Sequence, residues 1–234
     1  MVATLVEAEM ANITAGQLIV GAFNLARSQY PELNKRWINA SYRMGGIIRD
    51  AALTFVLQQA GELDLLCRSI EQETQRSIKS QQSTSGSEGT DLQINYLELL
   101  SSQWVSVTYA AHFALHSRKL LPTVADNFFD QIRILRVQLE KHEIADPKDR
   151  KQRRQVPIEM TRMPEKDGDR PFLYDPRSAT RSHITPRGLS QRGSYAWLLI
   201  KIDKNKQENI WVERQDLANQ MLSIWSPPLP QQRI

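Results

Sequence analysis

Helical periodicity is clearest in the stretch MGGIIRDAALTFVL, residues 44–57, and this stretch decides the fold class. Ile47, Ala51 and Phe55 recur at every fourth position, and Ile48 and Ala52 repeat the same spacing. Such spacing places apolar side chains on one face of an α-helix. We therefore predict an amphipathic helix over about residues 32–58, which the pair Gly45-Gly46 kinks or splits.

Apolar stripes of the same kind lie on both sides of this stretch. Leu18 and Leu25 mark one face of an earlier helix, and Tyr96 and Leu99 mark one face of a later helix. Together with a helix that begins near Gly61, they predict a mainly α protein whose residues 1–145 form a bundle of about five helices. The predicted bounds of the other helices are 5–29, 91–121 and 122–142.

Residues 146–194 have a different composition, and we call them the basic arm. Residues 146–192 hold twelve Lys and Arg against seven Asp and Glu, together with six of the eleven prolines. Residues 1–100 carry eight basic against eleven acidic residues, whereas residues 101–234 carry twenty-two against fifteen. An extended segment with regularly spaced arginines suits a polyanion. The candidates in the arm are Arg177, Arg181, Arg187 and Arg192.

The last forty residues, 195–234, read as a small α+β element. The runs YAWLLIKI (195–202) and IWV (210–212) are rich in strand formers and flank a polar turn, which predicts a β-hairpin. Residues 215–225 then predict a closing helix. The predicted fold is thus a helical bundle, an extended basic arm and a C-terminal hairpin with one helix.

The bundle carries further basic residues near the predicted helix edges: Arg43, Arg49, Arg118 and Lys119. A long basic side chain there can cover apolar neighbours and leave its charge free. Combined with the arginines of the arm, these residues predict binding to a nucleic-acid backbone without sequence specificity.

No motif in the sequence argues for catalysis, a metal or a cofactor. Cys67 is the single cysteine, and His112 and His116 lack the Glu beside the first His that a metalloprotease helix needs. Phosphate-binding glycine loops are also missing. The N-terminus lacks a signal-peptide core and no apolar run approaches the length of a membrane span, so we expect a cytoplasmic protein without a membrane partner.

One enzymatic alternative remains open. Arg136 and His142, and likewise Arg177 and His183, are similar to the Arg…His pair of the helical ribonuclease family named for nucleotide binding in prokaryotes and higher eukaryotes. In that family the pair would stabilise a phosphate and move a proton during metal-independent RNA cleavage.

Two stretches resemble the small helical subunit of type III CRISPR effector complexes, the III-B version in particular. The first is residues 44–57, an apolar-glycine stretch followed by Ala-Leu-Thr-Phe. The second runs from Tyr96 through Trp104 to Arg118-Lys119. The resemblance covers about residues 13–121, and residues 122–234 are additional to the family pattern.

The resemblance implies a non-catalytic structural subunit that lines a guide–target RNA duplex beside other subunits of an effector complex. It also implies several copies, or neighbours, stacked head-to-tail in a filament. The sequence therefore leaves three hypotheses open: an RNA-backbone-binding subunit of this kind, the Arg136–His142 ribonuclease, and a protein–protein adaptor whose arm wraps a partner.

Overall fold

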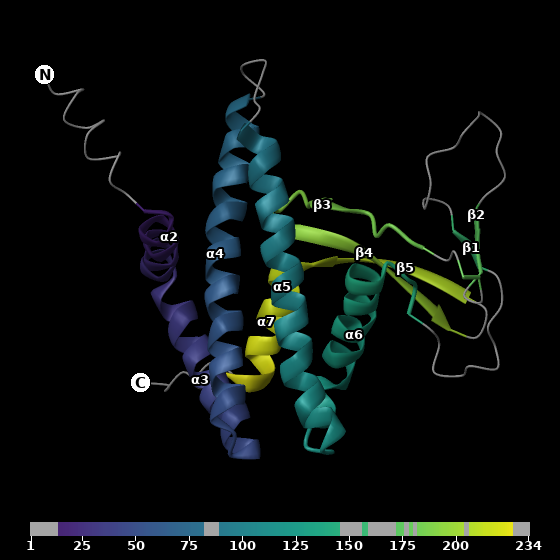
Figure 1. Cartoon of the computed structure of the whole chain (residues 1–234), viewed down its shortest axis with the longest axis horizontal. Helices are drawn as coiled ribbons and strands as arrows, with labels where there is room; N and C mark the ends of the chain where they lie inside the picture. Colours follow the sequence, from purple (N-terminus) through teal and green to yellow (C-terminus); the bar gives the residue numbers. More distant parts are fainter. Residues whose placement is uncertain are drawn as a thin grey trace, which may run out of the picture.

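The computed structural model describes residues 14–81, 89–145, 156–158, 172–175, 178–179, 182–203 and 206–226. These residues form a mainly helical protein with a three-stranded antiparallel sheet near the C-terminus (Figure 1). The predicted fold class is confirmed at this level. None of the described helices combines the length and apolar character needed to cross a lipid bilayer.

Two long antiparallel helices form the centre of the bundle, and shorter helices pack around them (Figure 1). The long helices are α4 (Ala51–Gln81) and α5 (Gly89–Ser117). The helix α3 (Pro31–Ile48) and the helix α6 (Asp126–Lys141) lie on opposite sides of this pair. The helix α7 (Arg214–Trp225) contacts α3 and α6. The remaining helices are α2 (Ala15–Gln29) and the short 3-10 helix η1 (Thr123–Ala125).

The break in the second predicted helix lies after the glycine pair rather than at it. The helix continues through Gly45 and Gly46, and ends at Arg49, which adopts a left-handed conformation with φ 56°. The N–H of Asp50 donates to the carbonyl of Gly45 (3.1 Å), and Asp50 caps the next helix by accepting from the N–H of Ala52 (2.9 Å). Gly45 is needed for close approach, since a Cβ there would lie 1.8 Å from Thr54 Oγ1.

The sequence predicts that a helix begins near Gly61, but in the structure Gly61 lies inside α4. A Cβ at Gly61 would lie 2.7 Å from Cβ of Trp37. The glycine lets α3 and α4 approach closely enough for the Trp37 ring to be buried between them. The loss of helix propensity at one glycine is offset by this packing, so α4 runs unbroken over 31 residues.

The apolar stripes predicted from the sequence are partly on the exposed side of their helices. Tyr96 and Leu99 of α5 are 60% and 65% exposed, whereas Leu97 and Trp104 of the same helix are buried. Leu18 and Phe55 are also exposed on their helices. Periodicity identifies an apolar face, but these helices carry apolar residues on more than one face. Only one face of each helix packs inside the described chain.

The sheet contains one strand more than the predicted hairpin. β4 (Tyr195–Asp203) pairs antiparallel with β5 (Lys206–Glu213) on one side and with β3 (Arg187–Leu189) on the other. β3 lies in the predicted basic arm. A separate antiparallel pair, β1 (Val156–Ile158) and β2 (Phe172–Tyr174), also falls in the arm. Three short segments of the predicted arm are therefore paired as β-strands.

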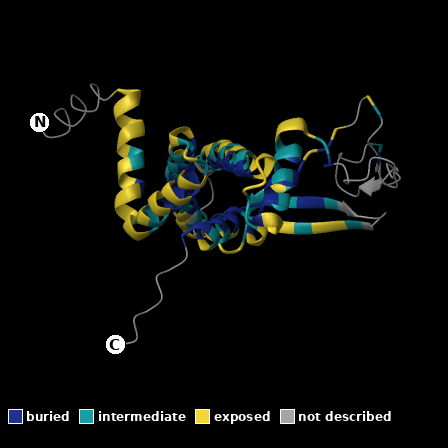
Figure 2. Cartoon of the chain, turned by 90° about the horizontal axis from the view of Figure 1, so that it is seen from below, coloured by how far each residue is buried: buried dark blue, intermediate teal, exposed yellow. Residues whose placement is uncertain are grey.

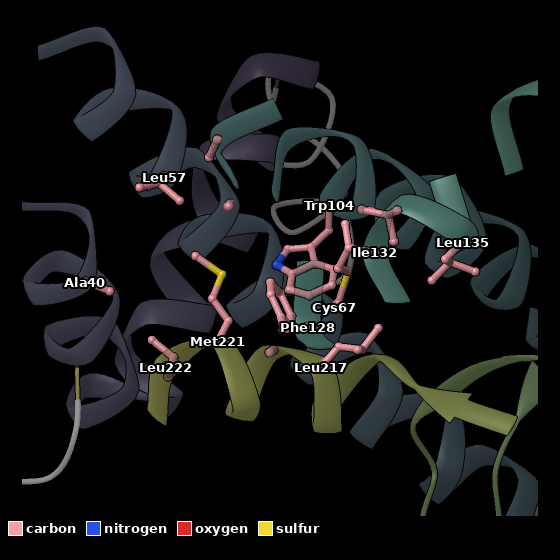
Figure 3. Packing of buried hydrophobic residues seen from close by; sticks show 14 of the residues in the cluster. Ala40, Leu57, Cys67, Trp104, Phe128, Ile132, Leu135, Leu217, Met221 and Leu222 are labelled. Atoms are coloured by element: carbon pink, nitrogen blue, oxygen red, sulfur yellow. The ribbon is translucent and has the colours of Figure 1, made fainter. Parts of the chain in front are cut away.

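One hydrophobic core joins the helices to the C-terminal element. Figure 3 shows Leu217 and Met221 of α7 directed toward the cluster that holds Trp104, Phe128 and Cys67. Tyr195 and Trp197 of β4 belong to the same core cluster. Because α7 and β4 share this core with α4, α5 and α6, the segment 195–226 is packed into the bundle.

A buried ion cluster fixes α7 against α4. The guanidinium of Arg214 is fully buried and donates two hydrogen bonds to Glu71, from Nε to Oε1 (3.0 Å) and from Nη2 to Oε2 (2.6 Å). Its Nη1 donates to Asp64 Oδ1 (2.5 Å). Asp64 also accepts from Arg68 Nε (3.0 Å) and Trp37 Nε1 (2.8 Å). Two arginines thus balance two carboxylates.

The cluster also organises the turn before β4 and the start of α7. Glu71 Oε1 accepts from the N–H of Tyr195 (2.8 Å), and the hydroxyl of Ser194 accepts from the N–H of Gln215 (3.2 Å) in the first turn of α7. Burial alone would raise the pKa of Asp64, but the adjacent guanidiniums of Arg68 and Arg214 lower that pKa below its ordinary value. The carboxylate therefore stays ionised inside the core.

A second buried polar contact holds the far end of α7. His112 Nε2 accepts from Trp225 Nε1 (3.1 Å), and His112 Nδ1 donates to the carbonyl of Thr108 (2.8 Å). The ring also packs against Phe128, with centroids 4.8 Å apart. Burial lowers the pKa of His112 to about 4, so the ring is neutral near pH 7.

Candidate nucleic-acid interface

Four of the predicted binding residues come together at one end of the bundle. The helices α4 and α5 are antiparallel and of similar length, so the start of α4 and the end of α5 lie at the same level (Figure 1). Arg49 lies in the link before α4, and Arg118 and Lys119 lie in the link after α5. We call Arg43, Arg49, Arg118 and Lys119 the basic end.

The two links at the basic end are built alike. Lys119 adopts a left-handed conformation with φ 58°, and Leu120 N–H donates to the carbonyl of Leu115 (2.9 Å), as Asp50 N–H does to Gly45. A left-handed cap normally favours glycine, because a Cβ there costs about 1 kcal/mol. Both links carry a basic side chain at this position instead. The side chains of Arg49 and Lys119 are exposed.

The charges at the basic end have no carboxylate partner among the described residues. None of its four side chains forms an ion pair with any residue that the structure describes. Arg43 donates one hydrogen bond, from Nη1 to the carbonyl of Trp225 (3.2 Å) at the end of α7. The acidic residues next to these links are Asp50, which already caps α4, and Asp126 at the start of α6. The local charge is therefore positive.

Two predicted arginines of the basic arm have carboxylate partners. Arg187 Nη2 lies 2.6 Å from Glu98 Oε1, so β3 is tied to α5. Arg192 pairs with Glu213 (2.9 Å) and also with Asp216. Because these charges are neutralised within the chain, we leave Arg187 and Arg192 out of the basic end. Arg177 and Arg181 lie outside the described residues.

The residues of the ribonuclease hypothesis are engaged elsewhere. Arg136 Nη2 pairs with Glu140 (2.6 Å), and its guanidinium carbon lies 4.5 Å from the ring centroid of Tyr109. His142 ends α6 in a left-handed conformation, and its carbonyl accepts from the N–H of His183 (2.6 Å). His183 is itself buried, and neither of its ring nitrogens has a hydrogen-bond partner among the residues that the structure describes. These contacts give Arg136 and His142 structural partners.

The histidine pair and the cysteine make packing contacts in the described structure. His116 stacks on Phe129, with ring centroids 4.7 Å apart, while His112 faces Trp225. Within the described part of the chain, no three His, Cys, Asp or Glu side chains gather as metal ligands. Burial raises the pKa of the Cys67 thiol to about 11, so Cys67 is a small buried apolar residue.

A partly apolar groove of about 590 Å³ lies where α2 meets α4 and α5. Val20 and Phe23 of α2 form one wall, and Leu63 of α4 and Val107 of α5 form the other. Tyr96 and Leu99 of α5 are exposed, and with 100° between residues they lie on the same side of the helix as Val107 of the groove. Figure 2 shows α2 exposed over almost its whole length, although it carries Leu18, Ile19, Val20 and Leu25.

The buried ion cluster was missed by the sequence reasoning. Asp64 and Glu71 are seven residues apart and so share one face of α4, which is the face that also buries Leu57 and Leu65. Two acidic residues on a core-facing stripe predict that a basic side chain is buried beside them. The sequence did not reveal that the cation is Arg214, 143 residues beyond Glu71.

Comparisons with protein-family models, curated proteins and solved structures returned no match to this chain.

Proposed function

We propose that the protein is a non-catalytic, RNA-backbone-binding subunit of a larger ribonucleoprotein, of the kind that the resemblance to type III CRISPR small subunits implies. The observation that carries the proposal is the basic end, where four cations that form no ion pair with a described residue lie in two segments at one end of the bundle. Phosphates are bound by such side chains without regard to base sequence.

The left-handed caps support a binding role for the basic end. Glycine would relieve the backbone at Arg49 and Lys119, and yet both positions hold long cationic side chains. Each of these residues lowers stability at its cap. A binding role for the two side chains explains why they occupy these positions. The rigid cores of α4 and α5 would hold both links in place, so little ordering entropy would be lost on binding.

The double substitution Arg49→Gly/Lys119→Gly tests this role. It is expected to leave the thermal midpoint unchanged or to raise it, because glycine suits both caps. The same variant is expected to bind an RNA duplex more weakly. The slope of log K against log salt should become shallower by about 2, since two phosphate contacts are lost. Fluorescence anisotropy with a labelled duplex at several salt concentrations measures both quantities.

The matched control is Arg187→Ala/Arg192→Ala, which removes the same charge from ion-paired positions. We expect RNA affinity close to that of the unmodified chain. Equal losses from the two double variants would mean that net charge alone determines binding, and the basic end would be rejected. A duplex of a second, unrelated sequence should give the same ranking of variants.

The apolar surface around α2 supports assembly from several copies. With 100° between residues, Leu18 and Leu25 lie on the side of α2 opposite to Val20 and Phe23, which line the groove. Both sides are apolar, and a helix of this kind is normally covered on both. If the free side of one copy enters the groove of the next, the contact is head-to-tail and repeats, which builds a filament.

Leu18→Glu/Leu25→Glu tests this assembly. The unmodified chain is expected to form species larger than a monomer as its concentration rises, with further growth on RNA. The variant should stay monomeric, because two carboxylates would have to enter an apolar groove. Sedimentation velocity distinguishes the outcomes. A chain that remains monomeric at high concentration with RNA present would contradict the head-to-tail contact.

A further inference from the structure

The strand β5 forms an open edge of the three-stranded sheet. The strand order is β3-β4-β5, so among the described strands β5 has a neighbour on one side only. Figure 2 shows β4 mostly buried and β5 mostly exposed. Among the described elements, β5 has its main contacts with β4 and with α7, the helix that follows it.

The hydrogen bonds of β4 determine which groups of β5 point outward. The N–H of Leu198 donates to the carbonyl of Pro186 (2.9 Å), so the backbone of Leu198 faces β3 rather than β5. The register pairs Leu198 with Trp211. In an antiparallel ladder such a pair is not hydrogen-bonded, and the N–H and C=O of Trp211 point away from β4. Backbone groups alternate in direction along a strand, so the N–H and C=O of Asn209 and Gln207 also point away from β4.

These outward groups lack partners. No described residue forms a hydrogen bond with the backbone N–H or C=O of Gln207, Asn209 or Trp211 on the open side. The three residues span about 14 Å. Trp211 is 59% exposed on this edge, and its strand has neither a proline nor a described bulge, two devices that protect natural edges.

From this geometry we propose that β5 takes up an extended segment of a partner protein as a fourth, antiparallel strand. The outward amides and carbonyls require a partner in strand conformation. An apolar side chain of the partner would pack on Trp211. A lysine or arginine would lie opposite Glu208, which is exposed and has no ion pair among the described residues.

Charge disfavours a second copy as the occupant. The antiparallel register that pairs all three outward residues is centred on Asn209, where Gln207 of one copy meets Trp211 of the other. In that register the Glu208 side chains of both copies lie on one face at diagonal positions. Like charges at such positions are destabilising. A basic partner strand removes this repulsion.

Hydrogen exchange tests the predicted geometry, and peptide selection tests the occupant. In the full chain, the amides of Gln207, Asn209 and Trp211 should exchange fast and those of Ile210 and Val212 slowly. Selection of random peptides on the full chain should return segments that alternate apolar residues with Lys or Arg. Binding of a selected peptide, made synthetically, should slow the three outward amides.

Asn209→Pro is the decisive variant, because it removes an outward N–H and leaves the ladder with β4 intact. It should bind the selected peptide about tenfold more weakly, and Asn209→Ala should bind it as the unmodified chain does. The inference is overturned by equal binding to Asn209→Pro. It is also overturned if raising the protein concentration without peptide slows hydrogen exchange at the outward amides, since a second copy would then cover the edge.

If Asn209→Pro melts well below the unmodified chain, Trp211→Ser replaces it and should weaken peptide binding by a similar factor. This inference does not depend on the basic end. Loss of peptide binding with unchanged RNA affinity would leave the proposed function intact.

Discussion

Replacing Arg214 with methionine is expected to lower the free energy of unfolding by about 3–5 kcal/mol. The guanidinium is fully buried and donates three hydrogen bonds, two to Glu71 and one to Asp64. Methionine fills much of the volume but leaves both carboxylates in the core with a single remaining arginine, Arg68. Breaking one side of a buried ion cluster is costly because the other side cannot be solvated.

Chemical denaturation of the full chain measures this loss. Arg192→Ala is the matched control, since Arg192 also pairs with two carboxylates but is exposed, and solvent screens such pairs. It should unfold close to the unmodified chain. The double replacement of Arg214 and Glu71 by apolar residues should recover part of the loss, because Asp64 then keeps Arg68 as its partner and no charge of the cluster is left unpaired. Equal behaviour of Arg214→Met and Arg192→Ala would contradict the buried cluster.

Lowering the pH from 6.5 to 4 is expected to remove about 3 kcal/mol of stability through His112 alone. The pKa of His112 is about 4 in the folded chain and near 6.5 in the unfolded chain. Between these values the unfolded state binds more protons, so stability falls as the pH falls. Protonation would also turn Nε2 from an acceptor into a donor facing the N–H of Trp225.

His112→Gln isolates this contribution, because a glutamine oxygen can accept from Trp225 but does not titrate. The variant is less stable at pH 7, and its stability should depend less on pH between 6.5 and 4. His183, whose pKa burial also lowers to about 4, remains in both chains and titrates in the same window. Asp64 titrates below that window. Unfolding curves at several pH values that run parallel in the two proteins would contradict the burial of a neutral His112.

Helix content could be predicted from the sequence, but helix ends and buried faces could not. Gly45 and Gly61 read as breakers because glycine is costly in a helix, whereas in the structure they admit Thr54 and Trp37 to close contact. That contact depends on the neighbouring helix, which local spacing does not encode. The actual break at Arg49 uses a left-handed arginine, a choice that propensity disfavours.

The candidate site was predicted in part. Arg43, Arg49, Arg118 and Lys119 were chosen because they sit near helix edges, and the antiparallel α4–α5 pair brings them to one end. The ion pairs of Arg187 and Arg192 depend on carboxylates 21 to 89 positions away, so composition could not identify them. Periodicity predicts the stripes of α2 and α5 as core, but local spacing does not encode which apolar face meets another helix, and Leu18 and Leu99 are exposed in the described structure.

Photo-crosslinking of the full chain to a thiouridine-substituted RNA duplex tests whether RNA lies against the basic end. Mass spectrometry of the crosslinked peptides should identify residues in the links 43–50 and 117–122. Crosslinks confined to the sheet and to residues 187–192, with none at the two links, would contradict the account.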